Sequence, residues 1–377
     1  MTLNKIASKR VLVRFDYNVP IYNKEIVNDF RIKQSLNTIK TLRKNNNNLI
    51  ILSHLGRPKE GENDKSLSLR PICDYLSLLI GERVEFLNSY NQEPTFDGYN
   101  IAMYENTRFI TGEKSCNPDL SKMLAKKGDV FVFDAFGVSH RKECTTYGIS
   151  DYIDTFPGLN ISHEIQTINK LINQNSRPMT IIISGAKVST KLIVIKKLLS
   201  KCDNMILGGG ILNTFLKALG YEIGNSLYEK DLVEEASKIL DSALSCKIKL
   251  PCDLHVSRTG TNENVLIDEI NKNDVIYDLG INTIDQIKNI IYQSNSIFWN
   301  GPLGYVEKKP FDTATVETAI AIANHKCFSI VGGGDTLPII ESLNIQNNYS
   351  CLSTGGGSLL TYIEGGSLPI LEKLGIE

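Results

Sequence analysis

The chain has 377 residues, of which 42% are hydrophobic and 22% charged, so it can bury a sizeable core and has the length of two or three domains. Its formal net charge of -1 argues against a general nucleic-acid-binding protein, because such proteins usually carry a positive field or a basic tail. No apolar run approaches the roughly 18 residues of a membrane span, and the first residues lack the apolar segment of a signal peptide. We therefore expect a cytoplasmic protein with no nucleic-acid or membrane partner.

The eight cysteines are scattered along the chain, and no two of them have Cys-x-x-Cys spacing. This spacing disfavours zinc-ribbon and thioredoxin-type sites. In a chain of this length, scattered cysteines indicate unpaired thiols in a reducing compartment, which agrees with a cytoplasmic location.

Short runs rich in Val and Ile recur along the chain, each followed by a polar or glycine loop and then by a helical-looking segment. Near-continuous apolar runs predict strands of a parallel sheet that is covered on both faces, and their spacing leaves room for crossover helices. We predict strands at residues 11–13, 49–52, 101–103, 130–133, 181–183, 205–207, 275–277, 297–299 and 328–331. The spacing of apolar residues predicts helices over residues 32–42, 71–80 and 231–244.

A boundary between two such α/β regions is predicted near the middle of the chain. Residues 161–172 have the pattern of one amphipathic helix, bounded by Pro157 and Gly158 before it and by Pro178 after it. A single helix that joins two α/β units can carry a hinge. The sequence thus predicts an α/β protein with two doubly wound parallel-sheet, Rossmann-like lobes. We expect an N-terminal lobe at 1–158, a hinge helix at 159–176, a C-terminal lobe at 177–364, and a tail at 365–377 that packs back on the N-terminal lobe.

In the first half, the predicted strands end in cationic residues. Ligands of open α/β sheets bind beyond the carboxyl ends of the strands, and clustered Arg side chains offer bidentate donors to phosphate and carboxylate oxygens. One strand-end Arg is explained by a surface salt bridge, but several of them predict an anion site. Asp16 and Asn18 lie on the same side of an extended segment and can bind hydroxyls of a small ligand. The cationic residues are Arg14, His54, Arg57, Arg108, His140 and Arg141.

In the second half, three glycine triplets follow short apolar runs, at residues 208–210, 332–334 and 355–357. No Gly is followed by Lys, which excludes a Walker-type loop, and no Gly-x-Gly-x-x-Gly fingerprint is present. Glycine lets the backbone approach a nucleotide, and a following helix offers free amide donors to phosphates, although a lone triplet is equally compatible with a tight turn. Gly334, Asp335 and Thr336 are more specific, because a carboxylate at a helix start beside a phosphate is a natural Mg²⁺ ligand.

The segment 184–191 is a further candidate anion site. Lys187 and Lys191 are four residues apart, so they would share one face of a helix. Like charges on one face are unfavourable unless an anion lies between them. The alternative is a solvated lysine pair.

Together these motifs resemble phosphoglycerate kinase. The resemblance implies reversible, Mg²⁺-dependent phosphoryl transfer from 1,3-bisphosphoglycerate to ADP, giving 3-phosphoglycerate and ATP, by a monomeric enzyme of glycolysis and gluconeogenesis. It places the phosphoglycerate in the N-terminal lobe and the nucleotide in the C-terminal lobe, so hinge closure would have to align them and exclude water. The matching segments follow the family's order at residues 14–20, 53–58, 134–141, 185–191, 208–215, 299–302, 332–336 and 353–357.

The resemblance also implies residue roles, with Asp16 and Asn18 on the glycerate, Arg31 on the reacting end, and Gly185 and Glu307 on the adenine and ribose. The non-transferred phosphate would be bound by His54, Arg57, Arg108 and Arg141. The expected substrate-binding residues are Asp16, Tyr17, Asn18, Arg31, His54, Leu55, Gly56, Arg57, Arg108, His140 and Arg141. The expected nucleotide-binding residues are Gly185, Lys191, Gly208, Gly209, Asn300, Glu307, Gly332, Gly333, Gly334, Asp335 and Thr336. The expected catalytic residues are Arg31, Lys187 and Lys191, and the expected metal ligand is Asp335.

Some positions depart from the family's usual pattern, and two other functions stay open. Ser184 stands where the family usually has Gly, which we expect to narrow the adenine slot. The rivals are a two-domain glycosyltransferase that uses a nucleotide sugar and a non-catalytic protein that closes around one anion. Against the glycosyltransferase, the strand-end cations fit a phosphorylated acid better than a sugar. Against the non-catalytic protein, a single ligand would not need anion-binding residues in both lobes. The departures are Asn37, Ser184, Ile281, Thr361 and Gly366.

Overall fold

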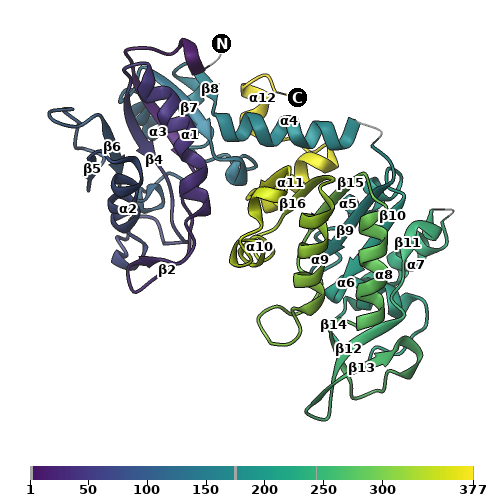
Figure 1. Ribbon diagram of the computed structural model, residues 1–377. Helices are drawn as coiled ribbons and strands as arrows, with labels where there is room; N and C mark the ends of the chain where they lie inside the picture. Colours follow the sequence, from purple (N-terminus) through teal and green to yellow (C-terminus); the bar gives the residue numbers. More distant parts are fainter. Residues whose placement is uncertain (1–2, 174–175, 243, 377) are drawn as a thin grey trace. The chain divides into compact units, whose positions relative to one another are not determined.

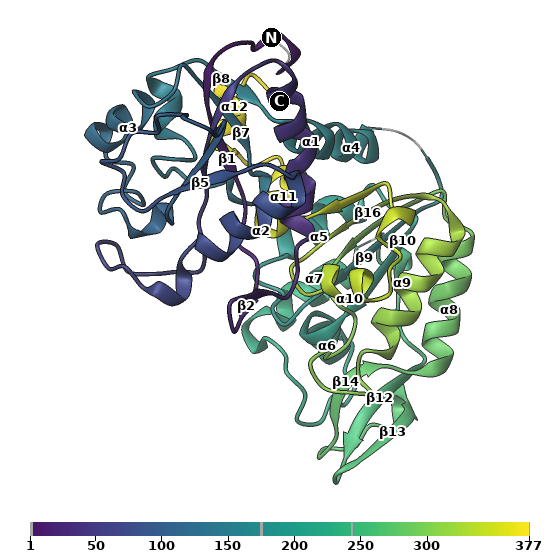
Figure 2. The same ribbon diagram turned by 60° about the vertical axis from the view of Figure 1, so that its left-hand side comes forward.

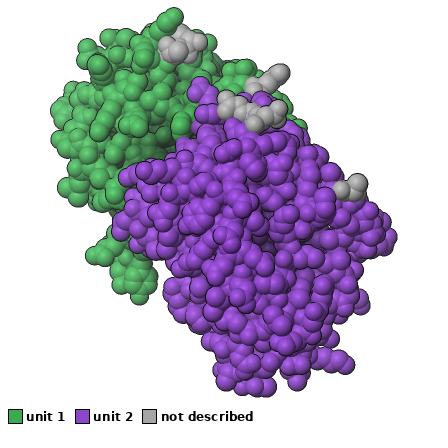
Figure 3. Space-filling model, turned by 45° about the vertical axis from the view of Figure 1, so that its right-hand side comes forward, with its two compact units in different colours: residues 1–165, 365–377 green, residues 166–364 purple. Residues whose placement is uncertain are grey.

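The structure is a computed structural model that describes residues 3–173, 176–242 and 244–376. The chain divides into two compact units: unit 1 comprises Met1–Ile165 and Gly365–Glu377, and unit 2 comprises Gln166–Glu364 (Figure 3). Helix α4 (Leu159–Asn173) belongs to unit 1 in its first half and to unit 2 in its second half. In the described ranges, none of the helices combines the length and apolar character that crossing a membrane requires.

Unit 1 contains a six-stranded parallel sheet in the order β5-β6-β4-β1-β7-β8 (Figure 1). The chain starts at β1 in the middle, extends to one side and then returns to the other, as in doubly wound folds. Val11, Leu12 and Val13 of β1 are fully buried, because the sheet is covered on both faces. The strands are β1 (Arg10–Phe15), β4 (Asn48–Leu52), β5 (Val84–Leu87), β6 (Ile101–Tyr104), β7 (Val130–Asp134) and β8 (Thr155–Pro157).

The helices of unit 1 begin and end where local chemistry favours it. In α2, Pro71 occupies the first turn and Gly81 closes the helix with a left-handed φ of 71°. The side chain of Asn117 accepts a hydrogen bond from the amide of Leu120 and so caps α3. The predicted helices at 32–42 and 71–80 are confirmed within α1 and α2. The elements are α1 (Phe30–Lys44), α2 (Arg70–Ile80), α3 (Pro118–Ala125), α12 (Pro369–Lys373) and a hairpin of β2 (Ile21–Tyr22) and β3 (Glu25–Ile26).

The C-terminal segment returns to unit 1, where α12 lies near β8 (Figures 1 and 2). Lys373 forms an ion pair with Asp151, and its ammonium lies 4.4 Å from the ring centroid of Tyr147. These contacts tie the end of the chain to the loop that follows β7.

Unit 2 is built around a second six-stranded parallel sheet, in the order β11-β10-β9-β15-β16-β17. Counted along the chain, this order is that of the Rossmann fold, which confirms the predicted fold class. The strands are β9 (Met179–Ser184), β10 (Asn204–Gly208), β11 (Ile248–Lys249), β15 (Ser296–Asn300), β16 (Phe328–Gly332) and β17 (Cys351–Ser353).

Seven helices in the described part of unit 2 accompany this sheet, and α8 and α9 lie side by side (Figure 1). The predicted helix at 231–244 is wrong at both ends, because α7 covers only Val233–Leu240 after a 3-10 turn at Lys230–Leu232, and residue 243 lies outside the described ranges. Asp241 and Ser242, which favour helix ends, follow directly. The helices are α5 (Leu192–Leu199), α6 (Gly209–Ala218), α7 (Val233–Leu240), α8 (Ile281–Tyr292), α9 (Thr313–His325), α10 (Leu337–Ser342) and α11 (Gly356–Glu364).

The predicted parallel strand at 275–277 is also wrong in its partners. It lies in β14 (Val275–Leu279), which pairs antiparallel with β12 (Asp253–Arg258), and β12 pairs with β13 (Thr261–Leu266). Burial in β14 alternates over its first residues, as expected of a strand with one covered face. The turn at Thr259 and Gly260, with φ values of 45° and 92°, joins β12 to β13 as a two-residue hairpin.

Candidate functional site

In unit 1, charged side chains lie in the loops that follow β1, β4, β6 and β7. These strands are neighbours in the order β6-β4-β1-β7, and all are parallel, so their carboxyl ends meet at one edge of the sheet. Hydrogen bonds and ion pairs connect most of the polar residues there. We call them the unit 1 cluster: Asp16, Asn18, Arg31, Gly56, His54, Arg108, Arg141 and Glu143.

Asp16 is the acidic centre of one side of this cluster. Its Oδ2 forms an ion pair with Nη1 of Arg31, and its Oδ1 lies 3.8 Å from Nδ1 of His54. Burial alone would raise the pKa of Asp16, but the charge of Arg31 holds it below its usual value, so it is a carboxylate. Burial also lowers the pKa of His54 to about 3 despite the attraction of Asp16, so His54 is neutral.

Glu143 joins two arginines on the other side of the cluster. Its Oε1 lies 3.7 Å from Nη2 of Arg108 and 3.4 Å from Nη1 of Arg141. Arg108 is buried, and its Nη1 donates to the carbonyl of Gly56. Its Nε, together with Oγ1 of Thr107, is buried without a hydrogen-bond partner among the described residues. Unpartnered buried donors of a cation are costly, so an anionic acceptor at this position would stabilise them.

Some residues expected to bind substrate do not bring their side chains into the cluster. Tyr17 is fully buried in the core, and its hydroxyl lies 2.8 Å from Oγ of Ser35. Leu55 belongs to the same core. Arg57 is exposed, and the exposed His140 accepts a hydrogen bond at 3.4 Å from Nε of Arg141. Their roles in binding stay predictions.

Gly56 takes part through its backbone. Its amide donates to Oδ1 of Asn18 at 2.8 Å, and its φ of 62° is one that glycine adopts readily. Sequence reasoning missed the acids Glu113 and Glu143 and the hydroxyl of Thr145. Their signal is their position, because Glu113 follows Arg108 in one cluster loop and the other two follow Arg141 in the next.

In unit 2, the corresponding strand-end loops bring one lysine onto backbone oxygens. Nζ of Lys191 donates to the carbonyl of Ser184, and the carbonyl of Asn300 lies 3.3 Å away. Burial lowers the pKa of Lys191 to about 8, against an opposing effect of Asp335. The carbonyl of Gly332 accepts from Nδ2 of Asn300 at 2.9 Å, so the ends of β15 and β16 are linked.

The expected pairing of Lys187 and Lys191 on one helix face is wrong, because the helix starts only at Leu192. Lys187 lies in the preceding loop and is exposed, whereas the side chain of Lys191 turns inward. Glu307 is exposed in the loop between β15 and α9. The hydroxyl of Ser184 donates to the carbonyl of Pro302, and the expected narrowing of an adenine slot stays a prediction.

The three glycine triplets differ in their surroundings. The first packs against the loop after β9: a Cβ on Gly210 would overlap the carbonyl of Ala186, and the amide of Ile211 donates to the carbonyl of Gly185 at 3.1 Å. In the second, a Cβ on Gly334 would have nothing within 4 Å. The third leads into α11, where Gly356 is equally open. Close backbone packing therefore explains the first triplet, whereas the second is packed at Gly332, against Leu359, and open at Gly334.

Asp335 and Thr336 follow the second triplet. Asp335 is exposed, while Thr336 is fully buried and its Oγ1 has no hydrogen-bond partner among the described residues. No group of three or more metal-ligating side chains occurs in the described part of the chain. A cation at Asp335 would therefore need the oxygens of a ligand as well, which suits Mg²⁺, an ion that binds through one or two carboxylates and phosphate oxygens.

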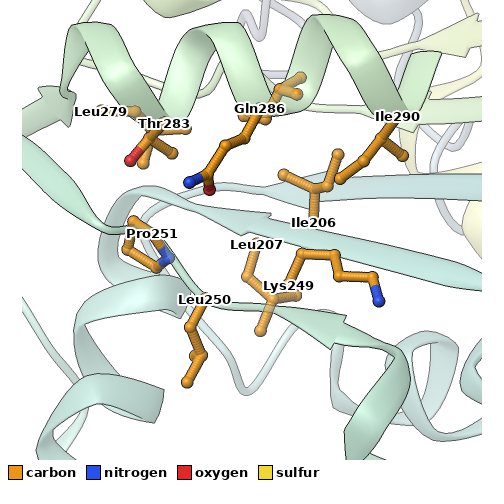
Figure 4. A pocket seen from close by; sticks show the side chains of 10 residues that line it. Ile206, Leu207, Lys249, Leu250, Pro251, Leu279, Thr283, Gln286 and Ile290 are labelled. Atoms are coloured by element: carbon orange, nitrogen blue, oxygen red, sulfur yellow. The ribbon is translucent and has the colours of Figure 1, made fainter. Parts of the chain in front are cut away.

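Two hollows lie away from these loops. One, in unit 2, has a volume of about 20 Å³, room for little more than a water molecule, and lies between β10, β11 and α8 (Figure 4). The other, in unit 1, is an open groove between α2 and the β2–β3 hairpin. Neither shares a residue with the unit 1 cluster or with the glycine loops, so neither is the candidate site.

Two Rossmann-like units, one with a cluster of acids and arginines in which Arg108 is buried and one with glycine loops around a lysine, fit a phosphotransferase that handles a phosphorylated acid and a nucleotide. The profile of the phosphoglycerate kinase family matches residues 1–366. The chain belongs to the phosphoglycerate kinase family. Enzymes of this family transfer a phosphoryl group between 1,3-bisphosphoglycerate and ADP in glycolysis, so both rival functions considered from the sequence are rejected.

Related sequences and solved structures match this chain over nearly its whole length. The chain is 40% identical to the phosphoglycerate kinase of Francisella tularensis subsp. novicida (strain U112), over 98% of this chain and 96% of the relative. It is 42% identical to that of Legionella pneumophila (strain Lens), over 98% and 95%. The solved phosphoglycerate kinase structures from Coxiella burnetii and Pyrococcus horikoshii OT3 match with TM-scores of 0.85 and 0.86, at 36% and 28% identity, each over 98% of this chain and 96% of the other.

Proposed function

We propose that the unit 1 cluster binds the phosphoglycerate substrate. Asp16 and Asn18 bind the glycerate hydroxyl, and Arg31 contacts the reacting carboxyl-phosphate end. The unpartnered Nε of Arg108 supports this assignment most directly, because a phosphate oxygen would satisfy it and balance the buried charge. The groups assigned to the non-transferred phosphate are His54, Arg57, Arg108 and Arg141.

The loops of unit 2 bind the nucleotide in this proposal. The backbone at Gly333 and Gly334 and the buried hydroxyl of Thr336 face its phosphates, and Lys191 supplies positive charge. Asp335 would be the protein ligand of Mg²⁺, and the ion would supply positive charge to the phosphate oxygens. Gly185 lies against the adenine and Glu307 binds the ribose.

In this phosphoryl transfer, the protein mainly positions the two substrates and supplies positive charge. In the direction that uses ATP, the carboxylate of 3-phosphoglycerate attacks the γ-phosphorus directly as its bond to ADP breaks and ADP leaves, so no general base is needed. Charge in the transition state spreads over the oxygens of the transferring group, which Arg31 and Lys191 stabilise. Asp16 fixes the guanidinium of Arg31 through their ion pair, so less orientational freedom is lost when substrate binds.

Location and assembly are also proposals. The cysteines that the structure describes are all free thiols, which supports a reducing, cytoplasmic environment. We propose that the protein acts as a monomer, with no nucleic-acid or membrane partner.

A coupled assay of ATP formation from 1,3-bisphosphoglycerate and ADP tests the proposal. We expect activity that is lost with a metal chelator and restored by excess Mg²⁺. Isothermal titration then separates the two units: Arg108→Ala should weaken binding of 3-phosphoglycerate and leave MgADP binding unchanged, and Asp335→Ala should do the reverse. Equal weakening of both ligands by either variant would contradict the assignment of residues.

A further inference from the structure

A second, deeper network of charges lies behind the unit 1 cluster. Arg14, the last but one residue of β1, is fully buried and makes hydrogen bonds from three nitrogens. Its Nη1 donates to the carbonyl of Phe15, and its Nε donates to Oγ1 of Thr145 at 3.2 Å. Its Nη2 lies 3.1 Å from Nδ1 of His54. A buried guanidinium needs a counterion close by, since its desolvation is otherwise uncompensated.

Glu113 is the acid whose charge attracts Arg14 most, although burial raises the pKa of Glu113 to about 7, and Thr145 connects the two residues. The hydroxyl of Thr145 accepts from Arg14 and donates to Oε1 of Glu113, and its amide lies 3.3 Å from both carboxylate oxygens. Glu113 is fully buried and lies in the loop after β6, whereas Thr145 lies in the loop after β7. The charges that act on Arg14 are, in order, those of Glu113, Asp16 and Glu143. One hydroxyl therefore joins a buried acid to a buried base across two loops.

The geometry determines which ring nitrogen of His54 carries the proton. The guanidinium of Arg14 has hydrogen-bond donors but no acceptor, so Nδ1 of His54 must accept the hydrogen bond from Nη2. The competing contact, 3.8 Å from Nδ1 to Oδ1 of Asp16, is too long for a hydrogen bond. A neutral imidazole with an accepting Nδ1 carries its proton on Nε2.

We propose that Glu113, Thr145 and Arg14 form a positioning relay that holds His54 as the neutral, Nε2-protonated tautomer. The ring then offers a fixed donor to an oxygen of phosphoglycerate, a role that rests on the proposed function. None of the three relay residues needs to touch the substrate. The alternative is that the network only holds the loops together, in which case removing it would change stability and leave the tautomer of His54 unaltered.

The tautomer can be measured directly in the ligand-free protein. Long-range ¹H–¹⁵N NMR of protein labelled in histidine distinguishes protonated from unprotonated ring nitrogens, and His54→Gln identifies the signals of His54 among those of the five histidines. We expect a protonated Nε2 and an unprotonated Nδ1 throughout the neutral pH range. A protonated Nδ1 in the wild-type protein would overturn the proposal without any variant.

Variants then test the relay itself. Arg14→Met combined with Glu113→Gln removes both buried charges together, so neither is left uncompensated. We expect the proton of His54 to move to Nδ1, toward Asp16, or the ring to become doubly protonated near neutral pH. The KM for 3-phosphoglycerate should rise about tenfold, the scale for losing one hydrogen bond to a charged group, with little change in kcat. An unchanged Nε2 tautomer in this folded variant would overturn the relay.

Thr145 provides the matched pair of controls. Thr145→Ser keeps the hydroxyl and should keep both the tautomer and the KM, whereas Thr145→Val removes it and should shift both part of the way. Titration with 3-phosphoglycerate separates this inference from the proposed function. If His54 has the expected tautomer but its signals do not respond to 3-phosphoglycerate, the relay stands and the substrate assignment of His54 fails.

Discussion

The candidate sites of the two units differ in the groups that they offer to the anionic ligands proposed for them. Unit 1 uses charged side chains, and each buried guanidinium there has an acid near it, Glu113 for Arg14 and Glu143 for Arg108. Unit 2 uses backbone, with glycine loops packed on one another and Lys191 resting on carbonyl oxygens. Substitutions in unit 1 should therefore act through charge and hydrogen bonding, and those in unit 2 mainly through shape.

Arg31→Ala should have the largest effect. The residue is the cation assigned to the reacting end of the substrate, so we expect kcat to fall by about 10²–10³ or more, the scale for losing one preorganised stabiliser. Steady-state assays in the direction of ATP formation measure it. Arg70→Ala is the control, since Arg70 is an exposed arginine of unit 1 paired with Asp74 and should leave kcat unchanged. A kcat of Arg31→Ala within twofold of wild type would remove Arg31 from the chemistry.

Arg108→Ala should come next and act on binding. Its guanidinium is buried between Gly56 and Glu143 with one free donor, so its loss should raise the KM for 3-phosphoglycerate by about 10- to 100-fold and change kcat less. Because removal leaves Glu143 buried without this partner, Arg108→Ala combined with Glu143→Gln separates lost binding from lost stability. An unchanged KM in both variants would exclude Arg108 from the substrate site.

How much of this could be read from sequence differs between the units. In unit 1, strand-end cations were visible because Arg14, His54 and Arg108 each follow an apolar run at a predictable edge of the sheet. Asp16, near His54, could be predicted, but the acids near Arg14 and Arg108 could not. Glu113 and Arg14 are far apart in the chain and are connected only because two loops pack against the end of β1, which no local pattern encodes.

In unit 2, the glycine triplets could be recognised in the sequence, but their roles could not be predicted from it. The triplets are identical in sequence, yet a Cβ on Gly210 would overlap a backbone carbonyl, whereas a Cβ on Gly334 would have nothing within 4 Å. The difference depends on which loop lies opposite each glycine. The apolar run of β14 was misassigned for a related reason: apolar composition predicts a strand, but its antiparallel partner, β12, comes from another part of the chain. The fold class could be predicted from the alternation of apolar runs and helical segments along the chain. The details of the sites could not, because they depend on long-range contacts.

The pH dependence of nucleotide use should report on Lys191. Burial lowers its pKa to about 8, so in the free enzyme the ammonium loses its proton as the pH rises through that value. Because the neutral amine attracts phosphate less, kcat/KM for MgADP should fall above pH 8, approaching about tenfold per pH unit. Lys191→Arg stays charged over this range and should remove the alkaline decline while lowering the overall rate. A decline that persists in Lys191→Arg would assign it to another group.

The smallest effects should separate the first glycine triplet from the second. Gly210→Ala places a methyl group against the carbonyl of Ala186, which should lower the free energy of unfolding by about 1–2 kcal/mol once the helix preference of Ala is counted. Gly334→Ala meets no neighbour, so stability should change by less than about 0.5 kcal/mol, while the KM for MgADP should rise because the methyl group occupies space assigned to phosphate. Urea unfolding and steady-state kinetics measure the two quantities on the same samples. A loss of stability in Gly334→Ala equal to that in Gly210→Ala, with an unchanged KM, would mean that both triplets serve packing alone, and the nucleotide assignment would then depend on Lys191 and Asp335.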